Sequence, residues 1–139
     1  MTLKLKLYNK KSIVKSDIEK LYKKQFNTNL MEENSKIIYG LYDDNKFVGY
    51  AIYIILQNNI TKIDWIYAPN YGYKFIKKIE SKLKRNQTKK IILNLSIDPT
   101  ENKIKVMKRI NFYINLHYKV YDIKFREKYG PLLYMEKNL

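Results

Sequence analysis

The chain begins with an alternation of apolar and basic residues. Residues 3–8 read LKLKLY, with a leucine at every second position. This period of two is typical of a β-strand that buries one face and leaves the other in water. The lysines on the second face predict a position at or near the edge of a sheet.

Three later segments repeat apolar residues every three or four positions, which predicts helices. The first helix is expected over residues 17–26, with Ser12 or Ser16 as its N-terminal cap. The second is expected over residues 73–85 and the third over residues 101–117. The expected apolar faces are Ile18, Leu21, Tyr22 and Phe26 in the first helix, Ile76, Ile79 and Leu83 in the second, and Ile104, Met107, Ile110 and Ile114 in the third, with Val106, Tyr113 and Leu116 beside the last.

Apolar runs separated by turn residues predict the remaining strands. Residues 36–56 form two such runs around Asp43 and Asp44, which indicates a β-hairpin whose second arm is a central strand buried on both faces. Further strands are expected at the sequences ITKIDWIY, IILNLSI, YKVYDIKF and PLLYMEKNL. This order predicts one domain over residues 1–139, an α/β fold with a single mixed, largely antiparallel sheet flanked by helices.

Composition narrows the chemistry. The sequence has no cysteine and one histidine, His117, so thiolate catalysis is excluded and a metal site is not expected. No segment approaches the roughly 18 uninterrupted apolar residues of a membrane span. The N-terminal alternation is also unlike the core of a signal peptide. We therefore expect a soluble protein that is cytoplasmic or otherwise intracellular and makes no membrane contact.

Charge leaves two interpretations open. The chain carries 28 Lys and Arg residues against 13 Asp and Glu residues, a formal net charge of +15. Such a charge attracts polyanions, and the 14 tyrosines offer rings that can stack on bases. The charge either reflects overall composition and solubility, or it marks a contact with nucleic acid or ribonucleoprotein. No recognisable nucleic-acid-binding motif supports the second interpretation.

The stretch IDWIYAPNYGYKF, from Ile63 to Phe75, is expected to be an apolar strand that leads through a proline-containing turn into a helix. A helix N-terminus presents free backbone N–H groups and the positive end of the helix dipole, which suits a phosphate. Phosphate loops usually contain several glycines, but this turn contains only Gly72. The stretch is therefore either a phosphate site of unusual composition or an ordinary helix start.

Three stretches together resemble the GNAT superfamily of N-acetyltransferases. YDDNKFVGYAIYII is similar to the family's hairpin, which has a glycine, here Gly49, early in its second strand. IDWIYAPNYGYKFIKKIESKL resembles the strand, turn and helix that hold acetyl-CoA in the family. INFYINLHYKV resembles the family's Phe-Tyr helix and the turn after it, with His117 in place of the usual glycine. The three stretches follow the family's order over residues 38–121.

The resemblance implies an acetyl-CoA site at the strand, turn and helix start. The residues that it assigns to the coenzyme are Trp65, Ile66, Tyr67, Gly72, Tyr73, Lys74, Phe75 and Lys77. Counted without a gap from Pro69, none of the three defining positions of the family's phosphate loop is kept, so the loop is degenerate. Lys74 and Lys77 could add charge there, whereas the Phe75 ring would obstruct a diphosphate unless it turns into the core. As side chains, Trp65 and Tyr67 are also interpreted as packing residues.

Two side chains are candidates for proton transfer. Asp64 alternates out of phase with Ile63 and Trp65, and it could take a proton from an amine directly or through water. The alternative for Asp64 is a surface or salt-bridged aspartate. Tyr113 matches the tyrosine that protonates the leaving thiolate in many members of the resembling family, and its alternative role is packing. His117 is interpreted as an exposed structural residue.

The resemblance implies an acetyl-CoA-dependent N-acetyltransferase in which a primary amine attacks the thioester directly, without a metal. The acceptor would be a small molecule or a protein. The alternative is a non-catalytic GNAT-like binding module that has lost the coenzyme site and uses its basic surface for nucleic acid or ribonucleoprotein. Either a monomer or a homodimer is expected, with the last strand, residues 131–139, as a candidate sheet edge for pairing.

Overall fold

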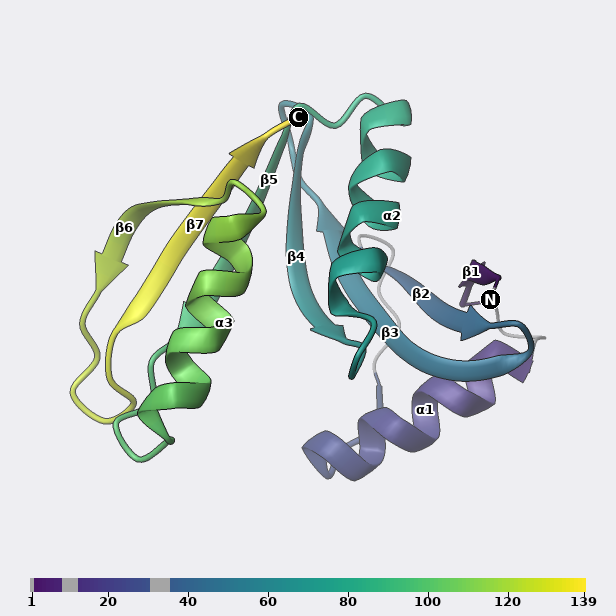
Figure 1. The fold of residues 1–139 in the computed structure, drawn as a ribbon, viewed down its shortest axis with the longest axis horizontal. Helices are drawn as coiled ribbons and strands as arrows, with labels where there is room; N and C mark the ends of the chain where they lie inside the picture. Colours follow the sequence, from purple (N-terminus) through teal and green to yellow (C-terminus); the bar gives the residue numbers. More distant parts are fainter. Residues whose placement is uncertain (1, 9–12, 31–35) are drawn as a thin grey trace.

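A single sheet of seven strands organises the chain. The computed structural model describes residues 2–8, 13–30 and 36–139, in which three helices flank this sheet (Figure 1). The elements are β1 (Leu3–Leu7), α1 (Ile13–Phe26), β2 (Lys36–Asp43), β3 (Lys46–Ile55), β4 (Ile60–Tyr67), α2 (Gly72–Arg85), β5 (Lys90–Ser96), α3 (Lys103–Asn115), β6 (Lys119–Lys124) and β7 (Leu132–Asn138). The strand order is β1-β2-β3-β4-β5-β7-β6. The predicted α/β class with one mixed sheet is confirmed.

Every neighbouring pair of strands is antiparallel except β4 and β5, which are parallel. The predicted hairpin is formed by β2 and β3, and its turn uses Asp44 in a left-handed conformation with φ of 53°. Asp43 has a further role, because its Oδ2 accepts a hydrogen bond of 2.7 Å from the Tyr71 hydroxyl. This bond ties the end of β2 to the turn that precedes α2.

Two apolar clusters cover the two faces of the sheet. On one face, Phe75 and Ile76 of α2 and Tyr113 of α3 join residues such as Leu41 and Ala51 in the larger cluster. On the opposite face, Ile18 of α1 packs against Ile38, Tyr42, Tyr50 and Ile52. The central strand β3 contributes to both clusters, because alternate residues of a strand point to opposite faces. The prediction that this strand is buried on both faces is therefore confirmed.

The buried face of α3 differs from the prediction. Ile104, Met107 and Ile114 were expected to face the core, but their exposed fractions are 67%, 52% and 47%. Val106 and Tyr113 are buried instead, and Ile110 packs against the larger cluster. Residues 106, 110 and 113 are four and then three positions apart, so they also satisfy the helical period. Apolarity alone did not distinguish the two neighbouring stripes.

The ends of the sheet also require corrections. The last strand, β7, is not an edge, because it lies between β5 and β6. β6 is the edge strand on that side, and β1 is the edge on the other side, as expected for the alternating N-terminal segment. Ser16 lies inside α1 and is not its cap, and Ser12 lies outside the described residues.

Candidate functional site

The parallel strands β4 and β5 pair over a short distance and then diverge. Their register joins residues 60–63 to residues 90–93 and goes no further, although both strands continue (Figure 1). Trp65, Ile66 and Tyr67 remain paired with β3 on their other side. The opening is a cleft of about 240 Å³ whose lining residues are Ile63, Asp64, Trp65, Ile66, Leu93, Asn94, Leu95, Ser96, Arg109 and Tyr113. Backbone groups that a continuous sheet would use are thus turned toward a cleft.

Asp64 is the extra residue of a β-bulge in β4. Trp65 lies opposite Ile52 and Ile63 lies opposite Tyr53, which leaves Asp64 without a partner on β3. The bulge places Ile63 in the larger cluster and Trp65 beside the smaller cluster on the other face. The expectation that Ile63 and Trp65 alternate in phase is therefore wrong. Asp64 is exposed at the cleft, where its carboxylate is open to solvent and to a ligand.

Tyr113 reaches the same cleft from α3. Its ring is 6% exposed and lies edge-on to the rings of Phe112 and Tyr118, with centroids 5.0 and 5.6 Å away. Burial raises the pKa of the Tyr113 hydroxyl to about 12, and the positive charge of Arg109 acts in the opposite direction. Tyr113 therefore carries its proton across the whole physiological pH range. The fold brings the two proton-transfer candidates, Asp64 and Tyr113, to one cleft from different elements.

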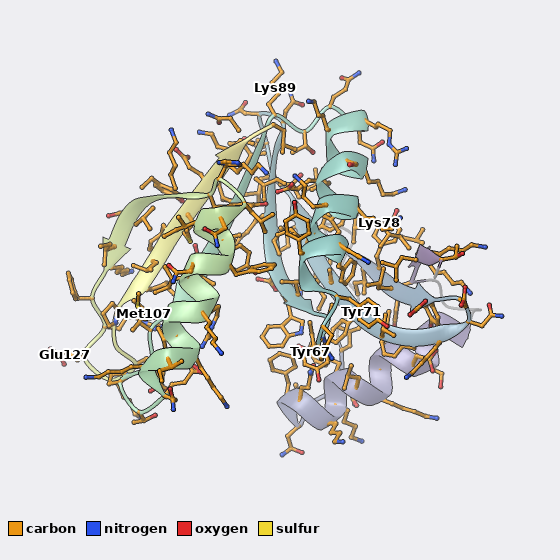
Figure 2. The ribbon with its side chains drawn as sticks, viewed as in Figure 1. Tyr67, Tyr71, Lys78, Lys89, Met107 and Glu127 are labelled. Atoms are coloured by element: carbon orange, nitrogen blue, oxygen red, sulfur yellow. The ribbon has the colours of Figure 1, made fainter. Side chains whose placement is uncertain are left out.

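The first turn of α2 is open for hydrogen bonding. Tyr71 precedes the helix without donating or accepting a side-chain capping bond, and its own N–H is bonded to the Ala68 carbonyl at 2.9 Å. The N–H groups of Gly72, Tyr73 and Lys74 follow in the first turn, where a helix offers no acceptor of its own. Tyr73 and Lys74 are exposed. Tyr67 and Tyr71 mark the end of β4 and the start of α2 in Figure 2.

The two glycines near this turn permit close packing. A Cβ atom on Gly49 would lie 2.4 Å from the Tyr67 carbonyl oxygen, so β3 can pass the end of β4 only without a side chain there. A Cβ atom on Gly72 would lie 3.4 Å from the Phe112 ring. Phe112 of α3 therefore stands next to the start of α2, and the helix start and the cleft belong to one region of the molecule.

Phe75 and Lys77 are engaged within the protein. The Phe75 ring is fully buried in the larger cluster, and its N–H is bonded to the Tyr71 carbonyl at 2.9 Å. Phe75 thus offers a ligand neither its ring nor its N–H, and its ring does not obstruct the start of α2. The Lys77 ammonium lies 3.6 Å from the Glu80 carboxylate. Lys74 is the exposed cation of the first turn.

The side chains of Trp65 and Tyr67 pack on the sheet face that α1 covers. The Trp65 ring meets the Phe26 ring of α1 edge-on with centroids 4.8 Å apart, and the Tyr67 ring lies 6.4 Å from the Tyr50 ring. Their backbones, not their rings, are the parts available to a ligand between β4 and β5. His117 is exposed and has φ of 71°, consistent with a turn residue after α3.

Arg109 was missed by the sequence analysis. It lies one helical turn before Tyr113, lines the same cleft and forms an ion pair with Glu101. The available signal was the spacing of four residues between an arginine and the candidate acid on one helix. Within the described part of the chain, no three His, Asp or Glu side chains group as metal ligands, and no helix is long and apolar enough to cross a membrane.

Comparison with known proteins supports the fold. No protein-family model matches the sequence. An uncharacterised N-acetyltransferase of Acanthamoeba polyphaga mimivirus is 29% identical over 110 residues, which cover 78% of this chain. The matched part of this chain spans 25% of the length of that relative.

Solved structures extend the likeness over nearly the whole chain. The aminoglycoside 6'-N-acetyltransferase from Enterococcus faecium superposes with a TM-score of 0.76 at 13% identity, covering 97% of this chain and 96% of that chain. A GNAT family acetyltransferase from Elizabethkingia anophelis with acetyl-CoA bound gives a TM-score of 0.72 at 12% identity, with coverages of 99% and 98%. The chain has the fold of the GNAT acetyltransferases, as its sequence indicated.

Proposed function

We propose that this protein is an acetyl-CoA-dependent N-acetyltransferase that acts on a primary amine. The observation that carries the proposal is the opening between β4 and β5, where Asp64 and Tyr113 approach one cleft beside the uncapped start of α2. A cleft bordered by unpaired strand backbone can hold an extended amide-containing chain, and a free helix N-terminus can hold phosphate. Acetyl-CoA combines these two parts and carries its acetyl group as an activated thioester.

The residues present fit this co-substrate in spite of the degenerate loop. The N–H groups of Gly72, Tyr73 and Lys74 would bind the diphosphate, because phosphate recognition at a helix start depends on backbone groups and the helix dipole. Lys74 would add an exposed positive charge there. The backbones of Trp65, Ile66 and Tyr67 would bind the pantetheine arm. Burial of Phe75 in the core leaves the approach to the helix start clear of its ring.

Proton transfer would be divided between two residues. An alkylamine with a pKa near 10 is mostly an ammonium ion at neutral pH and must lose a proton before it can attack a carbonyl. Asp64 is exposed at the cleft and would accept this proton, directly or through water. Tyr113 stays protonated at neutral pH and would donate to the thiolate that leaves. The acceptor would be a small molecule or the amine of a protein.

Ligand binding tests the coenzyme site without knowledge of the acceptor. We expect acetyl-CoA at about 100 times its Kd to raise the free energy of unfolding by about 2.7 kcal/mol, measured as an increase in Tm. ATP at the same concentration and salt is the control for a basic protein that binds any polyphosphate. Absence of a Tm increase together with absence of heat in titration calorimetry would refute the coenzyme site. An equal increase in Tm with ATP would show that the protein binds polyphosphates nonspecifically and not acetyl-CoA in particular.

A second candidate function is supported by a basic groove between β1 and α2. The groove has a volume of about 520 Å³, and its lining residues are Leu3, Lys4, Leu5, Lys77, Lys78, Ser81, Lys82 and Arg85. Five of these eight side chains are cations, and none is a carboxylate (Lys78 is labelled in Figure 2). The groove is where a nucleic-acid-binding module would make its phosphate contacts. That candidate requires tight oligonucleotide binding that weakens steeply with salt and is lost in Lys78→Glu.

A further inference from the structure

Arg109 and Tyr113 form a pair on one face of α3. They are four positions apart in the sequence, which places their side chains one turn apart on the same side of a helix. Both line the cleft between β4 and β5. Glu101, which precedes α3, forms an ion pair with the Arg109 guanidinium. The side chains of Arg109 and Glu101 are 38% and 34% exposed, so the ion pair is partly open to solvent. Arg109 lines the cleft, whereas Glu101 lines a separate pocket.

The Tyr113 hydroxyl has surroundings that disfavour negative charge. Phe112 and Tyr118 border its ring, and the Tyr118 hydroxyl is itself committed to the buried Glu80 carboxylate. Asp64 contributes a carboxylate from β4 on another wall of the cleft. Ser96, on β5, accepts a hydrogen bond of 2.6 Å from Arg126. Arg109 is thus the cation that lines the cleft together with Tyr113.

We propose that Arg109 is a positioning residue that acts through Tyr113, and that its guanidinium balances the phenolate formed when Tyr113 gives up its proton. This inference rests on the proposed acetyl transfer. As the amine nitrogen of the acceptor forms its bond to the acetyl carbon and the sulfur–carbon bond of the thioester breaks, Tyr113 Oη transfers its proton to the sulfur, which leaves as a thiol. The phenolate then regains a proton from solvent, and the proton taken by Asp64 from the acceptor returns to solvent. No oxidant or further reactant is needed.

Electrostatics supports this geometry. Burial raises the pKa of Tyr113 to about 12, and Arg109 is the group that opposes this rise. Glu101 would limit the movement of the guanidinium, because a paired arginine samples fewer side-chain positions than a free one. A phenol with a very high pKa is a weak acid, and a nearby cation makes proton donation easier by stabilising the product of that donation.

The ionisation can be measured without substrate. A fluorinated tyrosine placed at position 113 has a more acidic phenol, and ¹⁹F NMR can follow its titration in the folded protein. We expect Arg109→Gln to raise the pKa of this phenol by about half a unit or more, because an opposite charge is lost. Lys108→Gln removes one charge from an exposed position of the same helix and serves as the control. Equal pKa values in the original and Arg109→Gln proteins would overturn the proposal.

Turnover provides an independent test. Arg109→Gln should lower kcat about 10-fold when Tyr113 is present and have little further effect in the Tyr113→Phe background, because both changes then remove the same step. Arg109→Lys keeps a positive charge and should lose less kcat than Arg109→Gln. The control Lys108→Gln should keep the kcat of the original protein. An equal loss in both backgrounds would show that Arg109 does not act through Tyr113. If no acceptor is acetylated by any variant, the proposed function fails, while the ¹⁹F titration still decides the ionic coupling.

Discussion

Tyr113 meets two demands at one position. Its ring is part of the larger apolar cluster, and the residue also lines the cleft that Asp64 lines. The two roles that the sequence left open, packing and proton donation, are therefore compatible. A phenylalanine separates them, because it keeps the ring and removes the acidic proton.

We predict that Tyr113→Phe lowers turnover by roughly 10² or more, with little change in Tm or in acetyl-CoA affinity. Steady-state kinetics and thermal unfolding of the same preparation test the two parts. Tyr129→Phe is the matched control, because Tyr129 is 58% exposed and lies outside the cleft. Unchanged turnover in an active protein would mean that solvent or another group supplies the proton.

His117 shows how one residue limits stability. It has φ of 71° in the turn after α3, a conformation that costs most residues energy and suits glycine. We predict that His117→Gly stabilises the protein by about 1 kcal/mol, because the exposed imidazole gives up little on removal. Lys108→Gly, inside α3, should destabilise by a similar amount. Chemical denaturation measures both, and a loss of stability in His117→Gly would contradict the prediction.

At the scale of elements, one buried carboxylate connects α2 with β7. Glu80 is 6% exposed, and each of its two carboxylate oxygens accepts a hydrogen bond of 3.0 Å from the Lys137 ammonium. The Tyr118 hydroxyl donates to Glu80 Oε2 at 2.9 Å, which adds the turn after α3 to the same junction. The contact with Glu80 also helps to raise the pKa of Tyr118 above its ordinary value, although burial is the larger cause.

We predict that Glu80→Gln destabilises the protein by about 3 kcal/mol, because the largely buried Lys137 ammonium loses its counter-charge. Glu136→Gln is the control, since its partner Lys90 lies 3.2 Å away in a pair that is about one-third exposed. That control should lose less than about 1 kcal/mol. Similar losses in the two variants would show that the buried junction contributes no more than a surface pair.

The elements and their order followed from the sequence, whereas two local arrangements did not. The sheet and helices were predictable because several patterns are compatible with only one arrangement of buried residues. These patterns are the alternation in β1, the apolar run of β3 and the apolar stripe of α2. α3 carries two adjacent apolar stripes, and the choice between them depends on the neighbouring strands. The bulge at Asp64 depends on the register with β3, which no local pattern encodes. Asp64 and Tyr113 were named from the sequence as separate candidates, but their meeting at one cleft depends on the fold. Arg109 was not named, because its relevance comes from its place beside the cleft.

At the scale of the whole molecule, the burial of Tyr113 makes the free energy of unfolding decrease at alkaline pH. The folded pKa of Tyr113 is about 12, against about 10 in an unfolded chain. Because the folded pKa is the higher one, the unfolded state loses its proton first. The stability that this group contributes is complete below pH 10 and is lost as pH rises from about 10 to about 12.

We predict that the free energy of unfolding declines more steeply in the original protein than in Tyr113→Phe above pH 10. The difference should reach about 2 kcal/mol near pH 11.5. Denaturant titrations at a series of pH values measure it, and the comparison cancels the contribution of the lysines, which ionise in the same range. Parallel declines in the two proteins would show that folding does not raise the pKa of Tyr113.

The short parallel pairing of β4 with β5 divides the sheet into two antiparallel parts, β1 to β4 on one side and β5, β7 and β6 on the other. Four residue pairs join β4 to β5, whereas eight join β2 to β3 and seven join β5 to β7. Local unfolding of the sheet would therefore begin with the separation of β4 from β5 at the cleft, while the antiparallel strands on each side stay paired. A ligand bound in the cleft, as proposed for acetyl-CoA, would contact both parts of the sheet where they share the fewest residue pairs, and its binding would therefore hold the two parts together.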